Sequence, residues 1–403
     1  MTLEAPPSTR CGIDTTEIPR IEKLLRDTPE GDLRKLFSER ELAESGDGAE
    51  RAGRLAARFA AKEACCKLFP RETALGSVGP ADFSVRLDGY GAPHVEASER
   101  ARRAMDRAFI GEIRLSLTHT DSSASAVAVA EKRKFHPPWF GKVIYHILPL
   151  RRGTVMKNLR LAFGSVLDEA ELAQLAQAYY GHFVKFLIEF LCLPFRSAEQ
   201  KRKMIRIEGM DTAARAHAQG KGMLLLTGHF GNWEVATVAG IKQFDQFKGL
   251  FHFVRKPLKP AILNQFITWR FHQAGFGTIG KRGSLDAILE LLAKGKIIVF
   301  IYDQHAIRKE AVRAEFLGVP ASTFRSLPII AMSTGAPVVP ATSWREPDGT
   351  HVLRFEEPVA TVDHESTNEA IRLTATAFNK ALETALLRHP EQWIWMHQRW
   401  KEG

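Results

Sequence analysis

Two groups of residues in this chain have types and a spacing that could do chemistry. In the first group, Asp14 stands in GIDTTEI, Glu63 and Lys67 stand in RLAARFAAKEACCK, and His119 stands in SLTHT. Carboxylate oxygens are ligands that Mg²⁺ prefers, and one or two suffice because this ion keeps several waters. Asp14 and Glu63 are therefore candidate metal ligands. Lys67 and His119 are candidate phosphate contacts, and Lys67 could also accept a proton, so the group predicts metal-assisted chemistry on a phosphate ester.

Each member of this group also has a simpler interpretation. Glu63 and Lys67 have the spacing of an ordinary i,i+4 ion pair on a helix. His119 fits a histidine that is satisfied in a core or at a sheet edge. Spacing alone leaves both interpretations open.

The second group is a histidine and a glutamate five positions apart in MLLLTGHFGNWE. Gly228 and Gly231 permit a sharp exit from the apolar strand, and Asn232 can cap a helix that carries Glu234 in its first turn. Glu234 could then reach back to one imidazole nitrogen of His229 and fix its tautomer. The other nitrogen would be free to take a proton from a hydroxyl. The simpler interpretation is a pair that bonds within a core.

The elements that must position these groups fall into two halves. A chain of 403 residues is too long for one compact core, and EKRKFHPPW at residues 131–139 combines a charge run with two prolines. The first half has mixed α and β character. Its expected helices cover residues 18–27 and 50–69, and its expected strands cover residues 83–87, 113–118 and 124–130.

The second half begins with an expected helix over residues 168–193, after which strands alternate with helices. The strands are MLLLTG, GLFHFVRK, IIVFIYD and PVVPATSW, and the helices cover residues 261–274 and 284–294. This alternation predicts an α/β sheet, flanked by helices, whose chemistry lies at the strand ends.

The net charge of +10 is shared unevenly, because residues 1–131 carry −3 and residues 132–403 carry +13. The basic second half favours an anionic membrane surface or an acidic protein partner. Nucleic acid is the rival partner, but no nucleic-acid-binding module is visible in the sequence and we expect none to bind.

We expect peripheral contact with a membrane and no spanning helix, because no stretch reaches the roughly 18 consecutive apolar residues that a span requires. We expect residues 132–150 to form a linker between the two halves. Its segment WFGKVIYHILPL, at residues 139–150, follows a basic run and fits a helix lying in the membrane interface. It fits equally a helix packed on its own domain. Trp393, Trp395 and Trp400 are either interfacial anchors or core residues, and the core is favoured.

The four cysteines have neither the spacing of zinc ligands nor that of a disulfide framework; they are Cys11, Cys65, Cys66 and Cys192. The N-terminal residues MTLEAPPSTR lack the basic start and apolar core of a signal peptide. We therefore expect a cytoplasmic site of action.

Residues 11 to about 131 resemble holo-acyl-carrier-protein synthase, a 4′-phosphopantetheinyl transferase. GIDTTEI, PRI, ARFAAKEACCK, LDGYGAPHV and SLTHT occur in that family's order and at about its spacing. The resemblance implies an N-terminal domain, residues 1–131, with the α+β 4′-phosphopantetheinyl transferase fold. It also implies that Asp14 and Glu63 hold Mg²⁺ on the pyrophosphate of the substrate coenzyme A.

The same resemblance implies phosphate or proton-transfer roles for Lys67 and His119, and docking of acidic acyl carrier protein at Arg20. It further implies a homotrimer with its sites between subunits. One segment departs from the family, because LFPRETALGSVG follows Lys67 where a short glycine-rich turn near coenzyme A is usual.

Residues of about 140 to 401 resemble the lipid A late acyltransferases of the lysophospholipid acyltransferase superfamily. The stretches that carry the resemblance are RRGTVMKNLRLAF, GMLLLTGHFGNWE, FVRKP, YDQHA, FLGVPAST, TGAPVVP and PEQWIWMHQRW. It implies an acyltransferase domain over residues 151–403, with His229 as general base and Glu234 as its orienting partner.

The acyltransferase resemblance also implies further contacts to the substrate. It places Arg255 and Asp303 near substrate phosphates or at the floor of the site. Arg282 and the turn at residues 318–320 are candidate acyl or headgroup contacts. Many relatives begin with a membrane-spanning helix, whose place is taken here by the first domain.

Together the two resemblances predict a bifunctional enzyme at the cytoplasmic face of the inner membrane. One domain would load acyl carrier protein with 4′-phosphopantetheine, and the other would move an acyl chain from acyl carrier protein or acyl coenzyme A to a lipid hydroxyl. Two alternatives stay open. The first domain could be a non-catalytic docking module for acyl carrier protein, and the acceptor could be a lysophospholipid, an aminolipid or a glycolipid other than a lipid A precursor.

Overall fold

The computed structural model of the chain describes residues 9–69, 78–148, 150–240, 249–255, 261–280 and 284–401. The chain divides into two compact units, Met1–Lys134 and Phe135–Gly403. Each unit has its own sheet and its own buried apolar clusters. Among the helices in the described ranges, none combines the length and the apolar character that a bilayer span requires.

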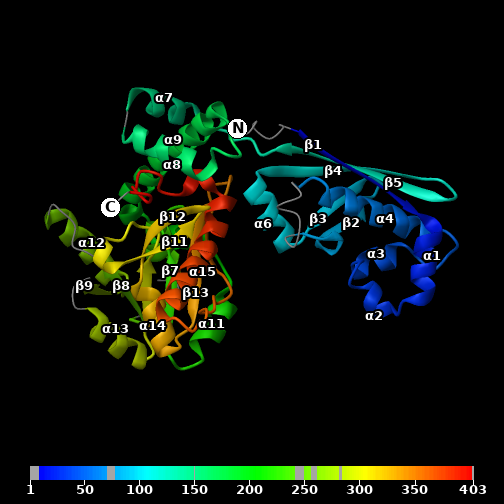
Figure 1. The fold of residues 1–403 in the computed structure, drawn as a ribbon. Coiled ribbons are helices and arrows are strands. Elements are labelled where there is room, and N and C mark those ends of the chain that lie inside the picture. Colours follow the sequence, from blue (N-terminus) through cyan, green and yellow to red (C-terminus); the bar gives the residue numbers. More distant parts are fainter. Residues whose placement is uncertain are drawn as a thin grey trace. The chain divides into compact units, whose positions relative to one another are not determined.

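The first unit is built on a five-stranded antiparallel sheet in the order β1-β5-β4-β3-β2 (Figure 1). Its strands are β1 (Thr9–Glu17), β2 (Phe83–Leu87), β3 (Pro93–Ala97), β4 (Ile110–His119) and β5 (Ser123–Lys132). Its helices are α1 (Ile18–Asp27), α2 (Glu30–Leu33), α3 (Glu39–Glu44), α4 (Arg51–Cys66), α6 (Glu99–Ala108) and the 3₁₀ turn η1 (Pro80–Asp82). The strands β1 and β3 were not among those expected from the sequence.

Helix α4 packs on one face of this sheet, against β1 and β5 (Figure 1). Every second residue of β5 from Ala124 to Ala130 is a buried alanine, and α4 presents Ala60 and Ala64, both fully buried. Small side chains on both surfaces let helix and sheet approach closely. A Cβ atom at Gly12 in β1 would lie only 2.0 Å from the carbonyl oxygen of Ala64, so the approach requires glycine there.

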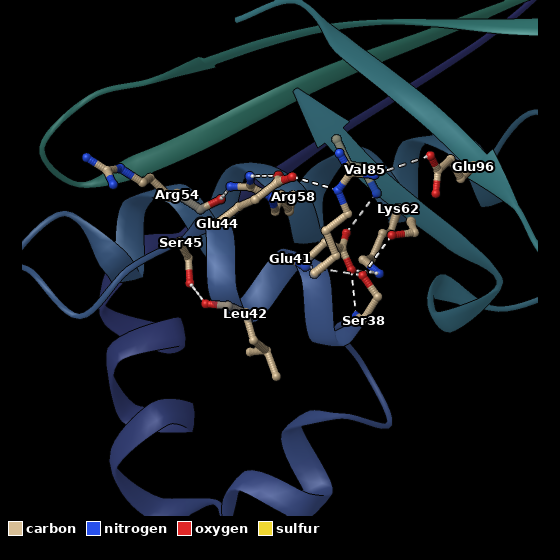
Figure 2. Close-up of polar contacts among 12 residues, drawn as sticks. Ser38, Glu41, Leu42, Glu44, Ser45, Arg54, Arg58, Lys62, Val85 and Glu96 are labelled. Atoms are coloured by element: carbon tan, nitrogen blue, oxygen red, sulfur yellow. Dashed lines mark hydrogen bonds and ion pairs between the residues drawn. The ribbon is translucent and has the colours of Figure 1, made fainter. Parts of the chain in front are cut away.

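A buried ion pair fixes α4 against α3 and β2 (Figure 2). The Lys62 ammonium lies 2.8 Å from the Glu41 carboxylate, and the two side chains are 1% and 0% exposed. Glu41 also completes a capping box with Ser38 at the start of α3, and it accepts a hydrogen bond from the backbone N–H of Val85 in β2. Because one carboxylate joins three elements, the rotation of α4 is set, and with it the position of the neighbouring Glu63.

The second unit contains a seven-stranded sheet in the order β6-β14-β13-β7-β10-β8-β9. Its strands are β6 (Ile205–Glu208), β7 (Met223–Thr227), β8 (Phe251–Arg255), β9 (Gly277–Gly280), β10 (Ile297–Ile301), β13 (Val338–Arg345) and β14 (His351–Phe355). The strands from β13 to β9 are parallel, and β14 pairs antiparallel with β13. The central strands β7 and β10 are continuous apolar runs because both of their faces are buried.

Helices surround this sheet (Figure 1). They are α7 (Trp139–Ile147), α8 (Arg152–Phe163), α9 (Glu169–Cys192), α10 (Ala198–Lys203), α11 (Met210–His217), α12 (Ala261–Gln273), α13 (Ser284–Ala293), α14 (Ser326–Thr334) and α15 (Thr367–Arg388). The short 3₁₀ turns are η2 (Leu193–Phe195), η6 (Arg308–Glu310) and η7 (Pro390–Gln392), and η3 (Val235–Gly240) is a π-helix. The strands β11 (Ala311–Phe316) and β12 (Val319–Phe324) pair in a separate hairpin. The predicted fold class is confirmed in both units.

Helix α7 has features of both interpretations given to it from the sequence. It packs on α9, where a Cβ atom at Gly141 would lie 2.5 Å from the carbonyl oxygen of Gln177. Its other face leaves Trp139 76% and Ile147 71% exposed. The helix is therefore packed on its own unit and also presents apolar side chains to its surroundings.

The interpretation of the C-terminal tryptophans as membrane anchors is wrong. Trp393 and Trp395 are fully buried and Trp400 is 7% exposed. The indole N–H of Trp393 donates to Asp303, and that of Trp395 donates to the carbonyl of Pro390. Buried indoles with satisfied N–H groups are core residues.

Candidate active sites

In the first unit, Lys67 pairs with Asp14 and not with Glu63. The Lys67 ammonium donates to Asp14 Oδ1 at 2.9 Å and to the carbonyl of Ile13 at 2.8 Å. Asp14 Oδ2 accepts a 3.3 Å bond from the hydroxyl of Thr16. Glu63 stands one turn before Lys67 on α4 and is partly buried, and its carboxylate makes no hydrogen bond or ion pair within the part of the chain that the structure describes. The expected i,i+4 ion pair does not form.

The carboxylates of Asp14 and Glu63 are of the ligand type that Mg²⁺ prefers. Asp14 and Glu63 lie on the packed elements β1 and α4, and the Glu63 carboxylate is not neutralised by a cation in the described ranges. Mg²⁺ commonly takes one or two carboxylates and completes its shell with waters and substrate phosphates. Across residues 9–401, leaving out the undescribed segments, no group of three or more His, Cys, Asp or Glu is placed to hold a metal.

Within one chain His119 does not join Asp14 and Glu63. It is exposed at the end of β4, opposite Ala124 of β5, and its ring lies 3.9 Å from the position of a Cβ atom at Gly53 in the first turn of α4. Glu63 is nearly three helical turns further along α4, about 15 Å at 1.5 Å per residue. The structure thus pairs Asp14 with Lys67, places Glu63 one helical turn before Lys67 on α4, and keeps His119 apart from Glu63.

Arg20 lies on the surface of α1. Its guanidinium stacks over the ring of Phe59 at 5.8 Å, and it forms no ion pair with any described residue. A preordered, uncompensated cation is suited to an acidic partner.

In the second unit, His229 and Asp303 meet at one edge of the sheet. They follow the neighbouring parallel strands β7 and β10, in which Thr227 lies opposite Ile301. His229 Nδ1 lies 3.0 Å from Asp303 Oδ1, and the backbone N–H of His229 donates to Asp303 Oδ2 at 2.7 Å. A Cβ atom at Gly228 would lie 2.9 Å from the same carboxylate, so glycine permits the approach.

Asp303 is ionised and fixes the tautomer of His229. Burial alone would raise the pKa of the Asp303 carboxyl, but the neighbouring imidazole and its hydrogen bonds outweigh burial and hold this pKa well below its usual range. Because a carboxylate only accepts, the proton of the neutral imidazole sits on Nδ1. His229 Nε2 makes no hydrogen bond among the described residues, and the side chain is 14% exposed.

In the structure the His229 side chain pairs with Asp303 and not with Glu234, the partner predicted from the sequence. Glu234 Oε2 lies 3.4 Å from Arg270 Nη2 of α12, whereas the hydrogen bonds of the His229 side chain to described residues go to Asp303. The reason is geometric. The ends of the adjacent parallel strands β7 and β10 already place Asp303 beside His229. The side chain of Asn232 accepts a hydrogen bond from the backbone N–H of Val235 at 3.2 Å, as predicted for a cap, and so starts a separate helical turn that carries Glu234.

A buried polar cluster that the sequence did not indicate supports the turn after β7. Glu189 of α9 accepts from the side-chain amide of Asn232 at 2.7 Å and from Nε of Arg345 at 2.9 Å. His182 donates to the carbonyl of Gly231 at 3.1 Å and accepts from Arg345 at 3.1 Å. Burial and the positive charge of Arg345 lower the pKa of His182 to about 3, so this histidine is neutral.

Two predicted substrate contacts are described only in part. Arg255 is the last residue of β8, so its backbone lies at the same edge of the sheet as Asp303. Arg282 lies outside the described residues. The turn at residues 318–320 belongs to the β11–β12 hairpin, where Gly318 has a φ of 76°. The altered segment after Lys67 also lies mostly outside the described residues.

Comparison with known proteins places each unit in a family. Residues 133–402 match the family of bacterial lipid A biosynthesis acyltransferases, and residues 10–128 match the 4′-phosphopantetheinyl transferase superfamily. The lipid A biosynthesis palmitoleoyltransferase of Escherichia coli is 26% identical over 269 residues, which are 65% of this chain and 82% of that protein. The phosphatidylinositol mannoside acyltransferase of Mycobacterium tuberculosis is 27% identical over 253 residues, 60% of this chain and 75% of that protein.

The first unit has relatives of its own. The holo-[acyl-carrier-protein] synthase of Syntrophus aciditrophicus is 34% identical over 123 residues, which are 30% of this chain and 95% of that protein. Both resemblances stated from the sequence are confirmed. The chain belongs to the bacterial lipid A biosynthesis acyltransferase family through residues 133–402, and it is an enzyme that joins this domain to a holo-[acyl-carrier-protein] synthase domain of the 4′-phosphopantetheinyl transferase superfamily.

Proposed function

We propose that the chain is a bifunctional enzyme that prepares acyl carrier protein and uses its acylated form. The first unit transfers 4′-phosphopantetheine from coenzyme A to a serine of apo-acyl carrier protein in a Mg²⁺-dependent reaction. The second unit transfers an acyl chain from acyl carrier protein, or from acyl coenzyme A, to a hydroxyl of a lipid such as a lipid A precursor. The observation that carries the second activity is the His229–Asp303 pair, in which His229 Nε2 makes no hydrogen bond to any residue that the structure describes.

In acyl transfer, His229 Nε2 takes the proton of the lipid hydroxyl while its oxygen attacks the thioester carbonyl. The C–O bond forms, the C–S bond breaks, and the proton passes to the departing thiolate. Asp303 stays ionised, holds the imidazole in its productive tautomer and stabilises the imidazolium. Incubation with labelled acyl carrier protein and total membrane lipid tests this proposal. We expect a labelled lipid with the wild type and none with His229→Ala.

In phosphopantetheinyl transfer, Asp14 and Glu63 would hold Mg²⁺, which supplies charge neutralisation to the pyrophosphate oxygens. Lys67, whose ammonium already lies at 2.9 Å from Asp14, would bind a phosphate oxygen. Labelling of apo-acyl carrier protein from coenzyme A tests this half. We expect labelling to require Mg²⁺ and to be lost in Asp14→Ala and Glu63→Ala but kept in the exposed control Asp47→Ala. An intact protein that labels nothing would favour the docking-module alternative.

We further propose that the first unit is complete only in an oligomer, a homotrimer in the expected family arrangement. The separation of His119 from Glu63 in one chain supports this, because a second copy could supply the missing histidine. Mixing Asp14→Ala protein with His119→Ala protein should restore part of the activity that each lacks alone. A mixture as inactive as its components, in a protein that sediments as a monomer, would contradict the proposal.

Acyl carrier protein is the proposed partner of Arg20. Its guanidinium has no ion pair among the described side chains, which supports docking of an acidic helix. We expect Arg20→Glu to raise the KM for apo-acyl carrier protein at least tenfold with little change in the KM for coenzyme A. Equal changes in both constants would argue for a structural role.

We propose peripheral binding at the cytoplasmic face of the inner membrane. Trp139 and Ile147 of α7 and Phe195 of η2 are 76%, 71% and 89% exposed in a unit of net positive charge, which suits an anionic lipid surface. Vesicles of anionic phospholipid should bind the wild type more tightly than a Trp139→Ser/Ile147→Ser variant. Tyr90→Ser, at a fully exposed position of the first unit, is the matched control.

A glycolipid other than a lipid A precursor is the second candidate acceptor. The similarity to phosphatidylinositol mannoside acyltransferase favours it. Lipid profiles of cells with and without active protein, with His229→Ala as the control, distinguish the acceptors.

A further inference from the structure

A cationic pocket adjoins the proposed general base. Its volume is about 230 Å³, and its lining residues are Arg151, Gln304, His305, His397, Gln398 and Lys401. The ring of His397 lies 5.1 Å from that of His229, centroid to centroid. A ligand in this pocket would therefore lie next to the imidazole that takes the proton.

The pocket carries positive charge that no carboxylate of its lining offsets. Arg151 donates a 3.4 Å bond to the carbonyl of Met396, and neither Arg151 nor Lys401 forms an ion pair with the residues that the structure describes. Burial lowers the pKa of His397, and His229 lowers it further; the Asp303 carboxylate opposes this shift, and the charge of Arg151 adds a smaller lowering. Burial likewise lowers the pKa of His305; a hydrogen bond with the backbone of Arg399 opposes this shift, and the charges of Arg399 and, to a smaller extent, Lys401 add to it. The two cations thus act on the interior of the pocket.

The walls of the pocket are fixed by hydrogen bonds. The side-chain amide of Asn158 donates to the carbonyls of Trp395 and His397 at 2.9 and 2.6 Å. Arg399, fully buried, donates to the carbonyl of Gln304 at 3.0 Å. Arg151 itself has a φ of 53°, a left-handed conformation that residues other than glycine seldom adopt. The cations are therefore presented by a preformed frame.

We propose that this pocket binds a phosphate ester of a substrate during acyl transfer. Guanidinium, ammonium and imidazole N–H groups are the donors that bind phosphate oxygens in proteins. The pocket is smaller than the roughly 300–1,000 Å³ that encloses a whole small-molecule ligand. It therefore takes one charged group of a larger substrate and leaves the rest outside. This inference rests on the proposed acyltransferase activity of the second unit.

Two substrates could supply the phosphate: a phosphorylated headgroup of the lipid acceptor, or the phosphodiester of the phosphopantetheine arm of the donor. The test is the full-length Arg151→Gln/Lys401→Gln variant, with Lys221→Gln/Lys294→Gln as the control. The control removes the same charge from exposed positions just before β7 and β10, at the opposite edge of the sheet. Kinetics are measured with phosphorylated and dephosphorylated acceptor, and with acyl-phosphopantetheine and acyl-pantetheine as donors.

We expect the pocket variant to lose about 100-fold in kcat/KM, roughly tenfold for each charge-assisted hydrogen bond removed. The difference between the pocket variant and the wild type should vanish with the dephosphorylated form of whichever substrate binds the pocket. That substrate, acceptor or donor, is then the source of the phosphate. Arg151→Lys/Lys401→Arg should recover most of the activity. Two outcomes would overturn the proposal. One is no loss of activity in the pocket variant. The other is a loss that persists with both phosphate-free substrates, which would indicate that the two cations dock the acidic surface of the carrier protein instead.

Direct binding separates this proposal from the proposed function. Inorganic phosphate should shift the imidazole C–H resonances of His305 and His397 saturably in the wild type and not in the Arg151→Gln/Lys401→Gln variant. An enzyme that transfers no acyl chain but shows these shifts would refute the acyltransferase proposal and leave the phosphate site standing. A wild type without shifts would refute the site.

Discussion

Replacing Asp303 with asparagine should remove acyl transfer by reversing the tautomer of His229. Asp303 Oδ2 accepts two hydrogen bonds, from the backbone N–H of His229 at 2.7 Å and from the indole of Trp393 at 2.9 Å. Oδ1 accepts from His229 Nδ1 at 3.0 Å. Since two donors converge on Oδ2, the amide oxygen of asparagine would take that position and its NH₂ group would face Nδ1.

An NH₂ group donates, so Nδ1 must become the acceptor and the imidazole proton must move to Nε2. Nε2 can then no longer take a proton from a lipid hydroxyl. In a Ser-His-Asp site the equivalent change lowers kcat by about 10⁴-fold, and we expect a loss on the order of 10³ to 10⁴ here, in kcat and kcat/KM alike. The number of hydrogen bonds is conserved, so the urea midpoint should change little.

The assay is steady-state transfer from labelled acyl carrier protein to lipid, with Glu234→Gln measured in parallel. Because Glu234 pairs with Arg270, we expect that variant to act mainly through stability and substrate binding. An Asp303→Asn enzyme that stays within tenfold of the wild type would refute the tautomer reasoning. A large kcat loss in Glu234→Gln alone would return the orienting role to Glu234.

Three further changes test the frame of each unit. Gly12→Ala places a Cβ atom 2.0 Å from a backbone carbonyl, so it should lower both the thermal midpoint of the first unit and its phosphopantetheinyl transfer, while Gly48→Ala, with nothing within 4 Å, should match the wild type. Lys62→Ala leaves the buried carboxylate of Glu41 unpaired and should lower the free energy of unfolding by roughly 3–5 kcal/mol in urea titrations. Lys35→Ala removes one partner of an exposed ion pair and should leave the free energy of unfolding nearly unchanged. Equal effects of the two substitutions would contradict the reasoning. Below pH 6.5 the unfolded chain protonates His182, whereas the folded chain does not until about pH 3. Between these pH values the free energy of unfolding of the wild type should fall by about 1.4 kcal/mol per pH unit more than that of His182→Gln. Parallel stability profiles for the two proteins would contradict the assigned pKa.

Much of the fold follows from local sequence patterns. The apolar strands β7 and β10 and the helix α9 are visible because their residues repeat with the period of their structure. The strand β1 was missed because Gly12 and Asp14 interrupt its apolar character. They are there for tertiary reasons, since Gly12 contacts Ala64 and Asp14 holds Lys67.

The candidate sites show the same limit. His229 was predicted from its place after a strand, which is a local property. Its partner was not, because the order of the strands in the sheet decides that Asp303 lies beside it, and the sequence does not state that order. The pair formed by Lys62 and Glu41 was missed for a similar reason, because a charged residue on a helix is normally exposed and burial depends on a partner from another element.

The most direct test of the central claim is single-turnover transfer from labelled acyl carrier protein to purified lipid by His229→Ala, compared with the wild type at equal folded concentration. If the imidazole removes the proton of the acceptor hydroxyl, the wild type forms labelled lipid and the variant forms none above background. Labelled lipid produced by the variant at the wild-type rate would contradict that claim.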